Sequence, residues 1–370
     1  MYQNPPRYVP GPPLMSAPPQ ARRGRIVPFV LSFVIIGGLF FGVSYSVMPD
    51  AEVRVLPGFA FAGTSERSVL LVPYERHGPR GMFQVFTQDQ FQVRLAAADP
   101  ASGAVLWDTQ LSDQLIWSAS VLAAGERYAY LATDDGLVIV GMADGEVVAR
   151  GAGVRGLGDA FVAAQAAYAY DPAGGRVLAL NADGDVLAIP LDQTTAASVD
   201  APTAAAWSAR LTTGPLPAPV PATTAQEAAL APGSAEKVAL QDLPLGIPGR
   251  MLVRPAPNGW DNPVGGATFR GGELVVVDGV AAGAASGHVL VEHQESVNDR
   301  DTTLSSVSLD SGQVIGSLPV PSGVDRVIAG SDGAVAVSGR DVLAVVLADG
   351  HVSDIEVGAV GFFGAPSEGD

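Results

Sequence analysis

Four histidines are the side chains best suited to acid–base or metal chemistry in this 370-residue sequence. Two of them, His288 and His293, stand on either side of Glu292 in one apolar run, a combination that can supply metal ligands. Residues two apart on a strand share a face, so His288 and Glu292 point one way and His293 the other. The three side chains cannot hold one ion locally, and we expect surface strand residues here and no metal site.

Two acidic turns have the composition of calcium loops. Asn181–Asp185 and Thr133–Gly136 each combine carboxylates with a glycine. Neither has the Asp-x-Asp-x-Asp-Gly spacing followed by a bidentate Glu that a calcium loop requires. Asp-Gly is also a strong hairpin signal, so turn chemistry explains both segments without an ion.

Other catalytic motifs are absent from the sequence. There is no Gly-x-Ser-x-Gly elbow, Walker loop, dinucleotide fingerprint or His-Glu-x-x-His helix. The sequence has no cysteine, which excludes disulfides, thiol catalysis and Cys-ligated zinc or iron–sulfur clusters. A triad assembled from distant residues stays open. We predict no cofactor and favour a protein that is not an enzyme.

The most unusual loop spans residues 74–83 and gathers positive charge and aromatic rings in an otherwise acidic region. Its candidate binding residues are Tyr74, Arg76, His77 and Arg80. The alternative is a solvated hairpin tip whose cations pair with nearby carboxylates.

A second candidate binding loop surrounds Trp260. The sequence there is Asn-Gly-Trp-Asp-Asn, residues 258–262. An indole on such a polar loop is costly to leave exposed without a partner, so we expect Trp260 to contact one.

Residues 26–48 form an uncharged run of 23 residues, and its relation to a membrane decides on which side these loops lie. As a helix it is about 34 Å long, enough to cross a hydrocarbon core of about 30 Å. Arg22, Arg23 and Arg25 precede it, which predicts a cytoplasmic N-terminus, a single membrane-spanning helix in contact with lipid, and an extracytoplasmic chain beyond it. A cleavable signal peptide is the alternative, but its apolar region is usually shorter.

Gly38 and Gly42 form a small-xxx-small pair within this run. Such a pair lets two membrane helices approach closely, so a homodimer through the helix is one possible assembly. The preceding residues 1–25 are rich in proline and predict a disordered cytoplasmic tail.

Charge excludes one class of partner for the rest of the chain. The protein carries a net charge of −17, and residues 1–50 contribute four Arg and one Asp, or +3, which leaves −20 for residues 51–370. Such an acidic body repels nucleic acid. We expect a protein or a component of the cell envelope as its partner.

Short apolar or alternating runs separated by Gly, Asp and Asn predict an all-β region after the helix. Expected strands include 68–74, 82–87, 90–97 and 204–211. Five glycines in acidic turns, at 103, 145, 184, 312 and 350, are separated by 42, 39, 128 and 38 residues. A period near 40 residues is typical of a β-propeller blade.

We therefore predict a propeller of five to seven blades over residues 49–364. A Pro- and Ala-rich segment at about 214–237 cannot be interior strand and is expected to leave the propeller. Residues 365–370 form a C-terminal tail.

The best-formed hairpin carries a family resemblance. The run Ala97-x-Asp99-x-Ala101-Ser102-Gly103-Ala104-x-x-Trp107 resembles the tryptophan-docking repeat of quinoprotein-type (PQQ-like) β-propellers, Ala-x-Asp-x-x-Thr-Gly-Lys-x-x-Trp. The resemblance implies that Asp99 and Gly103 shape the turn and that Trp107 packs against a neighbouring blade. The other four turns lack the Trp, so other side chains must pack there.

The layout as a whole is similar to membrane-anchored PQQ-like propeller proteins of actinobacterial type, whose function is uncharacterised. Quinoprotein dehydrogenases of this fold hold their quinone over a vicinal disulfide, which a chain without cysteine lacks. The resemblance therefore implies a non-catalytic scaffold outside the cell membrane that binds a protein or an envelope component. The alternative is a small-molecule sensor or enzyme with its site at the propeller channel.

Overall fold

A computed structural model gives the arrangement of the chain. It describes residues 26–63, 67–216, 221–256, 261–296, 298–340 and 342–359, with the backbone alone for 26–34. The Trp260 loop centre, the proline-rich residues 217–220, the N-terminal tail and the C-terminal tail lie outside the described residues.

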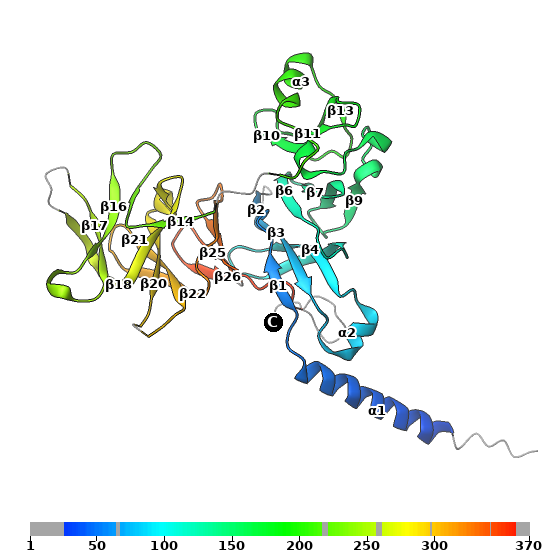
Figure 1. Ribbon diagram of the computed structural model, residues 1–370, viewed down its shortest axis with the longest axis horizontal. Coiled ribbons are helices and arrows are strands. Elements are labelled where there is room, and N and C mark those ends of the chain that lie inside the picture. Colours follow the sequence, from blue (N-terminus) through cyan, green and yellow to red (C-terminus); the bar gives the residue numbers. More distant parts are fainter. Residues whose placement is uncertain are drawn as a thin grey trace, which may run out of the picture.

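A single long helix, α1 (Ile26–Val47), precedes the β-structure. Pro28 lies in its first turn, where the missing N–H breaks no helical hydrogen bond. The Met48 amide donates to the Ser44 carbonyl at 3.1 Å at the other end. Figure 1 shows α1 next to the sheet that contains β1 and extending away from the rest of the β-structure. Within the part of the chain that the structure describes, no helix combines the length and the apolar character needed to cross a membrane.

The remainder is mostly β-structure, as predicted, and its strands form five sheets. The sheet nearest α1, which we call blade 1, has the order β1-β3-β4-β5, with β2 also beside β3. Its strands are β1 (Glu52–Val55), β2 (Ala60–Gly63), β3 (Ser68–His77), β4 (Phe91–Ala98) and β5 (Val105–Ser112).

Three further sheets each contain four antiparallel strands in sequence order. Blade 2 contains β6 (Ala119–Ala124), β7 (Tyr128–Thr133), β8 (Gly136–Gly141) and β9 (Val147–Arg150). Blade 3 contains β10 (Tyr168–Asp171), β11 (Arg176–Leu180), β12 (Val186–Pro190) and β13 (Ala197–Ser198). The last blade contains β23 (Arg326–Ala329), β24 (Val335–Ser338), β25 (Leu343–Val346) and β26 (Val352–Asp354).

The fifth sheet, which we call the large sheet, has nine strands. They are β14 (Thr223–Ala225), β15 (Glu227–Ala229), β16 (Lys237–Asp242), β17 (Arg250–Arg254), β18 (Asn262–Val277), β19 (Val280–Ala281), β20 (His288–Gln294), β21 (Thr302–Ser308) and β22 (Val314–Val320). Strand β18 is 16 residues long and pairs with four different strands. It therefore gathers into one sheet the residues that could have formed additional blades.

The large sheet also includes part of the segment expected to leave the propeller. Strand β14 pairs with β18, and β15 pairs with β16. These strands lie just beyond the prolines, where backbone N–H groups are again available to donate ladder hydrogen bonds.

Two expected strands are helices instead. Residues 82–87 lie in α2 (Gly81–Thr87), where the Gln84 side chain accepts a hydrogen bond from the Arg80 amide at 2.9 Å. Most of 204–211 lies in α3 (Ala201–Ser208), where Asp200 caps the Thr203 amide at 2.9 Å and a proline occupies the first turn. Capping and proline placement favour a helix over the weak β-pattern of these runs.

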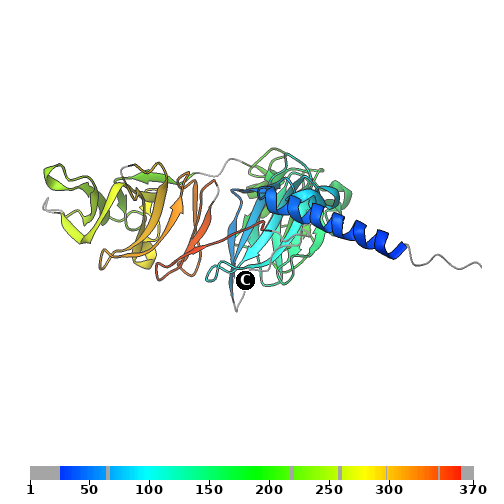
Figure 2. The ribbon, with the colours of Figure 1, turned by 90° about the horizontal axis from the view of Figure 1, so that it is seen from below.

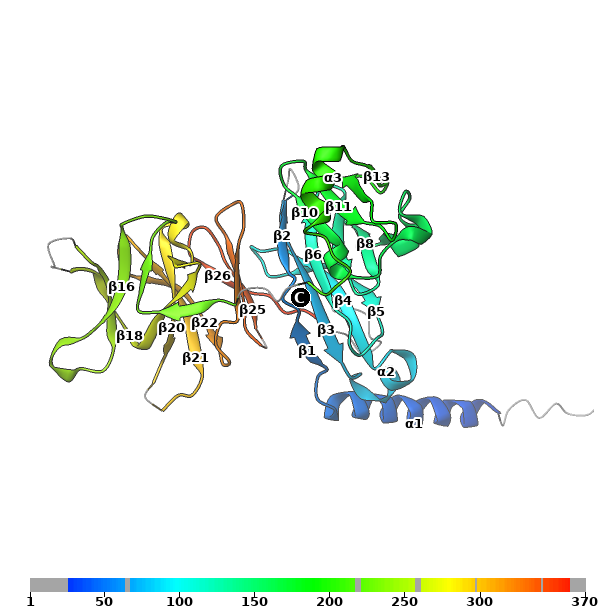
Figure 3. The same ribbon diagram turned by 45° about the horizontal axis from the view of Figure 1, so that its top comes forward.

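The five sheets follow one another in an arc (Figures 1 and 2), and neighbouring sheets share hydrophobic clusters. Shared clusters join blade 3 to blade 2, blade 2 to blade 1, blade 1 to the last blade, and the last blade to the large sheet. Among the described residues no hydrophobic cluster joins blade 3 to the large sheet. Helix α3 packs on blade 3 through Trp207 beside Leu178 and Leu211, and Figure 3 shows it over that blade at the end of the arc.

Candidate functional site

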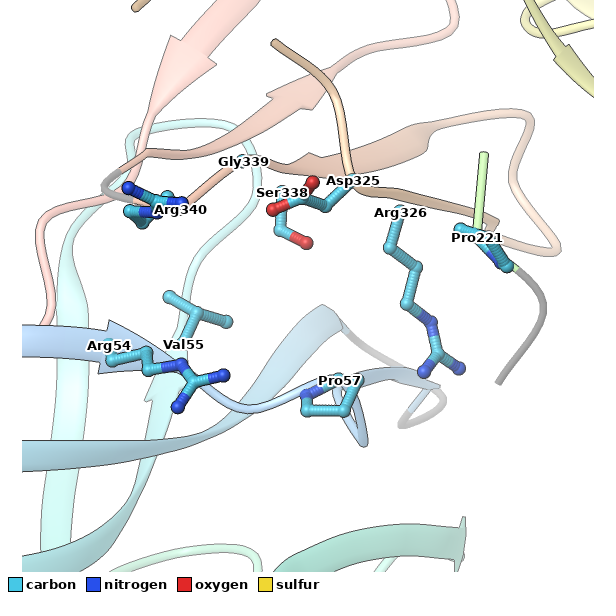
Figure 4. Close-up of a pocket in the computed structure, with 9 residues that line it drawn as sticks. All are labelled: Arg54, Val55, Pro57, Pro221, Asp325, Arg326, Ser338, Gly339 and Arg340. Carbon is cyan, nitrogen blue, oxygen red and sulfur yellow. The ribbon is translucent and has the colours of Figure 1, made fainter. Parts of the chain in front are cut away.

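A cavity of about 330 Å³ lies where blade 1 meets the last blade. Its walls come from the end of β1, the start of β23, the end of β24 and Pro221, which leads into the large sheet. Three arginines line it: Arg54, Arg326 and Arg340. Figure 4 shows Arg54 and Arg326 entering the space from opposite sides, with Pro57 between them.

Main-chain hydrogen bonds hold the wall that carries Arg326. The Asp325 amide donates to the Ser338 carbonyl at 2.8 Å, and the Ala222 amide donates to the Asp325 carbonyl at 2.9 Å. These bonds join the two neighbouring strands β23 and β24 to Ala222, which is about 100 residues earlier in the sequence. They fix the start of β23, and with it the point from which the Arg326 side chain leaves the backbone.

Arg326 is a half-buried cation without a carboxylate partner among the described residues. Its guanidinium lies over the Phe59 ring, 5.4 Å from the centroid, and burial lowers its pKa from the usual value. Arg326 also lines a neighbouring cavity of about 360 Å³ with Phe59, Phe61 and Val121. It therefore stands between two cavities at the inner edges of the blades.

The other two arginines are more exposed. Arg54 lies opposite Glu75 in the β1–β3 register, and its Nη1 is 3.9 Å from Glu75 Oε2, a weak ion pair with an Arg54 side chain that is 69% exposed. Arg340 is exposed and has no ion pair with the residues that the structure describes. The two guanidiniums are thus largely available to a ligand.

The charge of this cavity is opposite to that of the protein around it. Residues 51–370 contain 17 basic residues, 21 in the chain less the four in residues 1–50, and three of the 17 line this cavity. Asp325 is the one carboxylate among its described lining residues. Guanidinium groups bind carboxylate and phosphate oxygens and do not release protons near neutral pH. The arrangement can therefore bind an anion.

The structure places the predicted loop residues Tyr74 and Arg76 in the interior. Tyr74 is fully buried, and its hydroxyl donates to Asp108 Oδ2 at 2.5 Å. Burial, with Asp108 as a second cause, raises the Tyr74 pKa above its usual value. Arg76 is 3% exposed and donates to Gln84 and Gln88 at 3.0 Å each; burial lowers its pKa. Neither side chain is presented on a loop surface.

His77 and Arg80 also contact their own chain. His77 Nε2 is 3.3 Å from Glu75 Oε2. Arg80 forms an ion pair with Asp50 and lies over the Tyr45 ring of α1, 4.4 Å from its centroid. The unusual loop is therefore folded against the end of α1.

The residues of the tryptophan-docking hairpin lie between blades. Trp107 donates its indole N–H to the Met142 carbonyl of blade 2 at 2.8 Å. Asp99 accepts from the Ala101 amide at 2.9 Å and from Arg67 at 2.5 Å, and these bonds outweigh the effect of burial and lower its pKa. Gly103, at φ +74°, lies against the Asp354 carbonyl of the last blade.

The two glycines of α1 face open space. A Cβ added at Gly38 or at Gly42 would meet nothing within 4 Å. This position on the helix leaves both free to contact something other than the described remainder of the chain.

The His288 segment differs from expectation because His288 is buried, not on the surface. It is 1% exposed, and neither ring nitrogen makes a hydrogen bond within the described structure. Burial lowers the His288 pKa, and the nearby Ser286 carbonyl only partly opposes this. His293 instead approaches Ser305 Oγ at 2.8 Å. Within the described ranges, no three potential metal ligands gather.

The arginine cavity is the feature that sequence reasoning missed. Arg54 and Arg326 are 272 residues apart, which is 326 less 54, and they belong to no local motif. The one available signal was the scarcity of cations in residues 51–370. That scarcity does not indicate which cations lie close together. Only the packing of blade 1 on the last blade brings them together.

Comparisons with known proteins do not define a family. No family model matches the chain, and no curated protein matches it. Solved structures that align with it include BamB from Moraxella catarrhalis, at 14% identity and a TM-score of 0.24, covering 83% of this chain and 99% of that one.

A quinoprotein alcohol dehydrogenase-like protein from Bacteroides thetaiotaomicron aligns at 12% identity and a TM-score of 0.21, covering 82% of this chain and 66% of that one. AtxE2 isopeptidase aligns at 9% identity and a TM-score of 0.35, covering 85% of this chain and 54% of that one. These similarities are too low to carry an argument about function. The description of the fold as propeller-like and all-β rests on the five sheets themselves.

Proposed function

We propose that this protein is a non-catalytic scaffold, anchored in the cell membrane and facing outward, that binds the acidic segment of a partner protein. The observation that carries the proposal is the half-buried Arg326 cation, which has no counter-ion among the described residues and lines a cavity with two further arginines. Leaving a charge partly desolvated and unpaired is costly. A bound carboxylate would offset that cost through charge-assisted hydrogen bonds.

The anchoring part of the proposal rests on the N-terminal sequence. Residues 26–48 carry no charge and follow three arginines, the pattern of a helix with a cytoplasmic N-terminus. The described part of α1 exposes large apolar side chains, which suit contact with lipid: Ile35, Ile36, Leu39, Phe40, Val43 and Val47. Open space at Gly38 and Gly42 would also let two such helices pair.

A second candidate function is a small-molecule sensor or an enzyme that uses the inner cavities. The supporting observation is the second cavity, where Phe59 and Phe61 place aromatic rings beside Arg326. An aromatic wall next to a guanidinium suits a small anion with an apolar body.

The test measures whether anions stabilise the full-length protein in mild detergent. An oligo-glutamate peptide and citrate are added separately, and the melting temperature is followed, since a ligand that binds the folded state raises it. We expect the peptide to raise the melting temperature of the wild type. Arg326→Gln should weaken binding by about 10- to 100-fold, the effect of one charged hydrogen bond.

The matched control is Arg155→Gln, which removes the same charge from an exposed position in the segment between blades 2 and 3. It should respond like the wild type. An equal response from Arg326→Gln and the wild type would contradict the proposal. Stabilisation by citrate and not by the peptide would favour the second candidate.

A further inference from the structure

The short helix α2 is held against the outer end of α1. The Phe83 ring contacts the Phe41 ring edge to face, with centroids 5.9 Å apart. The Met82 amide donates to Ser44 Oγ at 2.9 Å. One turn of backbone in blade 1 is thus fixed directly to the last two turns of α1.

Helix geometry sets the depth of this contact if α1 spans the membrane. Phe41 lies 15 residues after Ile26, or about 22 Å along the helix at 1.5 Å per residue. A hydrocarbon core is about 30 Å thick. If the core begins at Ile26, the contact between α1 and α2 therefore starts about 8 Å inside the outer edge of the core at Phe41 and comes within about 3 Å of that edge at Ser44, about 27 Å along the helix, so α2 cannot stand clear of the bilayer.

Exposed apolar side chains lie at this end of blade 1. Phe86 of α2 is 72% exposed, and in the loop after β5 Leu115 is 55% and Ile116 88% exposed. The register places both segments at one end of blade 1, because His77 pairs with Phe91 and Val93 with Ser112. Figures 1 and 3 show α1 and α2 together at this end of the sheet.

We propose that α2 and the loop of residues 113–116 rest on the outer surface of the bilayer, with Phe86 and Ile116 in the boundary between headgroups and acyl chains. This inference rests on the proposed anchoring through α1. Aromatic and large aliphatic side chains favour that boundary. Helix α2 contacts α1 directly, through Phe83 on Phe41 and Met82 on Ser44, which argues for lipid as the occupant.

Charge indicates which lipid surface fits. Asp89, just after α2, and Asp113, the first residue of the loop, are both exposed. These carboxylates repel anionic headgroups, so the surface is suited to a zwitterionic lipid. This contact with the bilayer would hold blade 1 in one orientation to the membrane, with the arginine cavity at a fixed distance from it.

The absence of cysteine allows a direct test in the full-length chain. Single substitutions Phe86→Cys and Ile116→Cys are labelled with an environment-sensitive fluorophore, and the protein is placed in phosphatidylcholine vesicles. Val314→Cys, 43% exposed on the large sheet, is the matched control, and Ile36→Cys reports on α1 itself. Quenching is measured with spin-labelled lipid and with aqueous iodide.

We expect the labels at 86 and 116 to be quenched by the spin-labelled lipid several-fold more than the label at 314. Strong lipid quenching at 36 with none at 86 and 116 would overturn the proposed contact of α2 and the loop with the bilayer, and would leave the proposed anchoring through α1 intact. No lipid quenching at 36 would overturn both. Labels at 86 and 116 protected from lipid and from iodide would show that a protein, or a second copy of the chain, covers the surface, which also contradicts the proposal.

Discussion

Two turns with the same dipeptide occupy different environments in blades 2 and 3. Gly145 and Gly184 both follow an Asp and both have a positive φ, +74° and +88°. A Cβ added at Gly145 would lie 2.5 Å from Trp107 Cε3, whereas no atom of the described residues lies within 4 Å of the same point at Gly184. The first turn supports the outer strand of the preceding blade, and the second supports none.

This difference shows that the acidic turns have two separable roles. Each closes a hairpin, which needs only a residue that tolerates positive φ. Four of them also dock on another segment: Gly145 on Trp107, Gly103 on the Asp354 carbonyl, Gly350 on Ile315 and, within the large sheet, Gly312 on the Val264 carbonyl. Blade 3, whose turn docks on nothing, lies at the end of the arc. Outer-edge docking of a glycine turn and core packing therefore both hold the middle of the arc. Blade 3 is attached to blade 2 by core packing and by hydrogen bonds, among them Arg127 N–H to Asp192 Oδ1 at 2.7 Å and the Tyr130 hydroxyl to the Gln193 carbonyl at 2.7 Å.

The largest effect is expected from removing the docking ring itself. Trp107→Ala deletes a half-buried indole and its 2.8 Å hydrogen bond to the Met142 carbonyl. We expect a loss of about 3 kcal/mol in the free energy of unfolding, the lower end for an aromatic-to-alanine change because Trp107 is not fully buried. Chemical denaturation measures it. A loss below about 1 kcal/mol would show that the docking contributes little.

A smaller effect separates the two turns. Gly145→Ala and Gly184→Ala both place a side chain at positive φ, at a cost of about 1–2 kcal/mol each. Gly145→Ala should cost about 1–3 kcal/mol more, because its methyl group must displace Trp107. The comparison uses the melting temperatures of the two variants, and equal values would contradict the difference in docking.

The smallest effect concerns the other end of the arc, where the buried His288 ring has no hydrogen-bond partner among the described residues. Burial lowers its pKa in the folded state from 6.5, so the unfolded chain binds the proton more readily. Its contribution to stability is therefore present above about pH 6.5 and is lost as the pH falls toward the folded pKa.

The variant His288→Leu should lose this part of the pH dependence and be equally or up to about 1 kcal/mol more stable at neutral pH, because an unsatisfied polar group is removed. Denaturation at pH 5 and pH 7.5 measures both. An unchanged pH dependence would show that His288 does not titrate in this range. His293→Leu is the control variant, because it removes the other histidine of β20, whose ring is hydrogen-bonded to Ser305.

Local sequence was a good guide wherever backbone conformation depends on neighbouring residues. Strands such as β4 and β5 and the turn at Gly103 were predictable, because alternation and a glycine at positive φ act over a few residues. Helix α2 was not, since it depends on contact with α1. Helix α3 was missed although its signals are local, an Asp200 cap and a proline in the first turn. The register of β18 was also hidden, because this one 16-residue strand pairs with four different strands at different points along its length.

Composition and spacing thus specify an acidic all-β chain with repeated hairpins and an uncharged N-terminal run, because these properties reside in single residues and their near neighbours. The meeting of Arg54 with Arg326 and the fold of α2 onto α1 depend on surfaces that exist only after the sheets have formed. The residue types of Tyr74 and Arg76 suggested a binding loop. Both side chains are buried in the core instead. Desolvation and long-range contact are properties of the packed molecule.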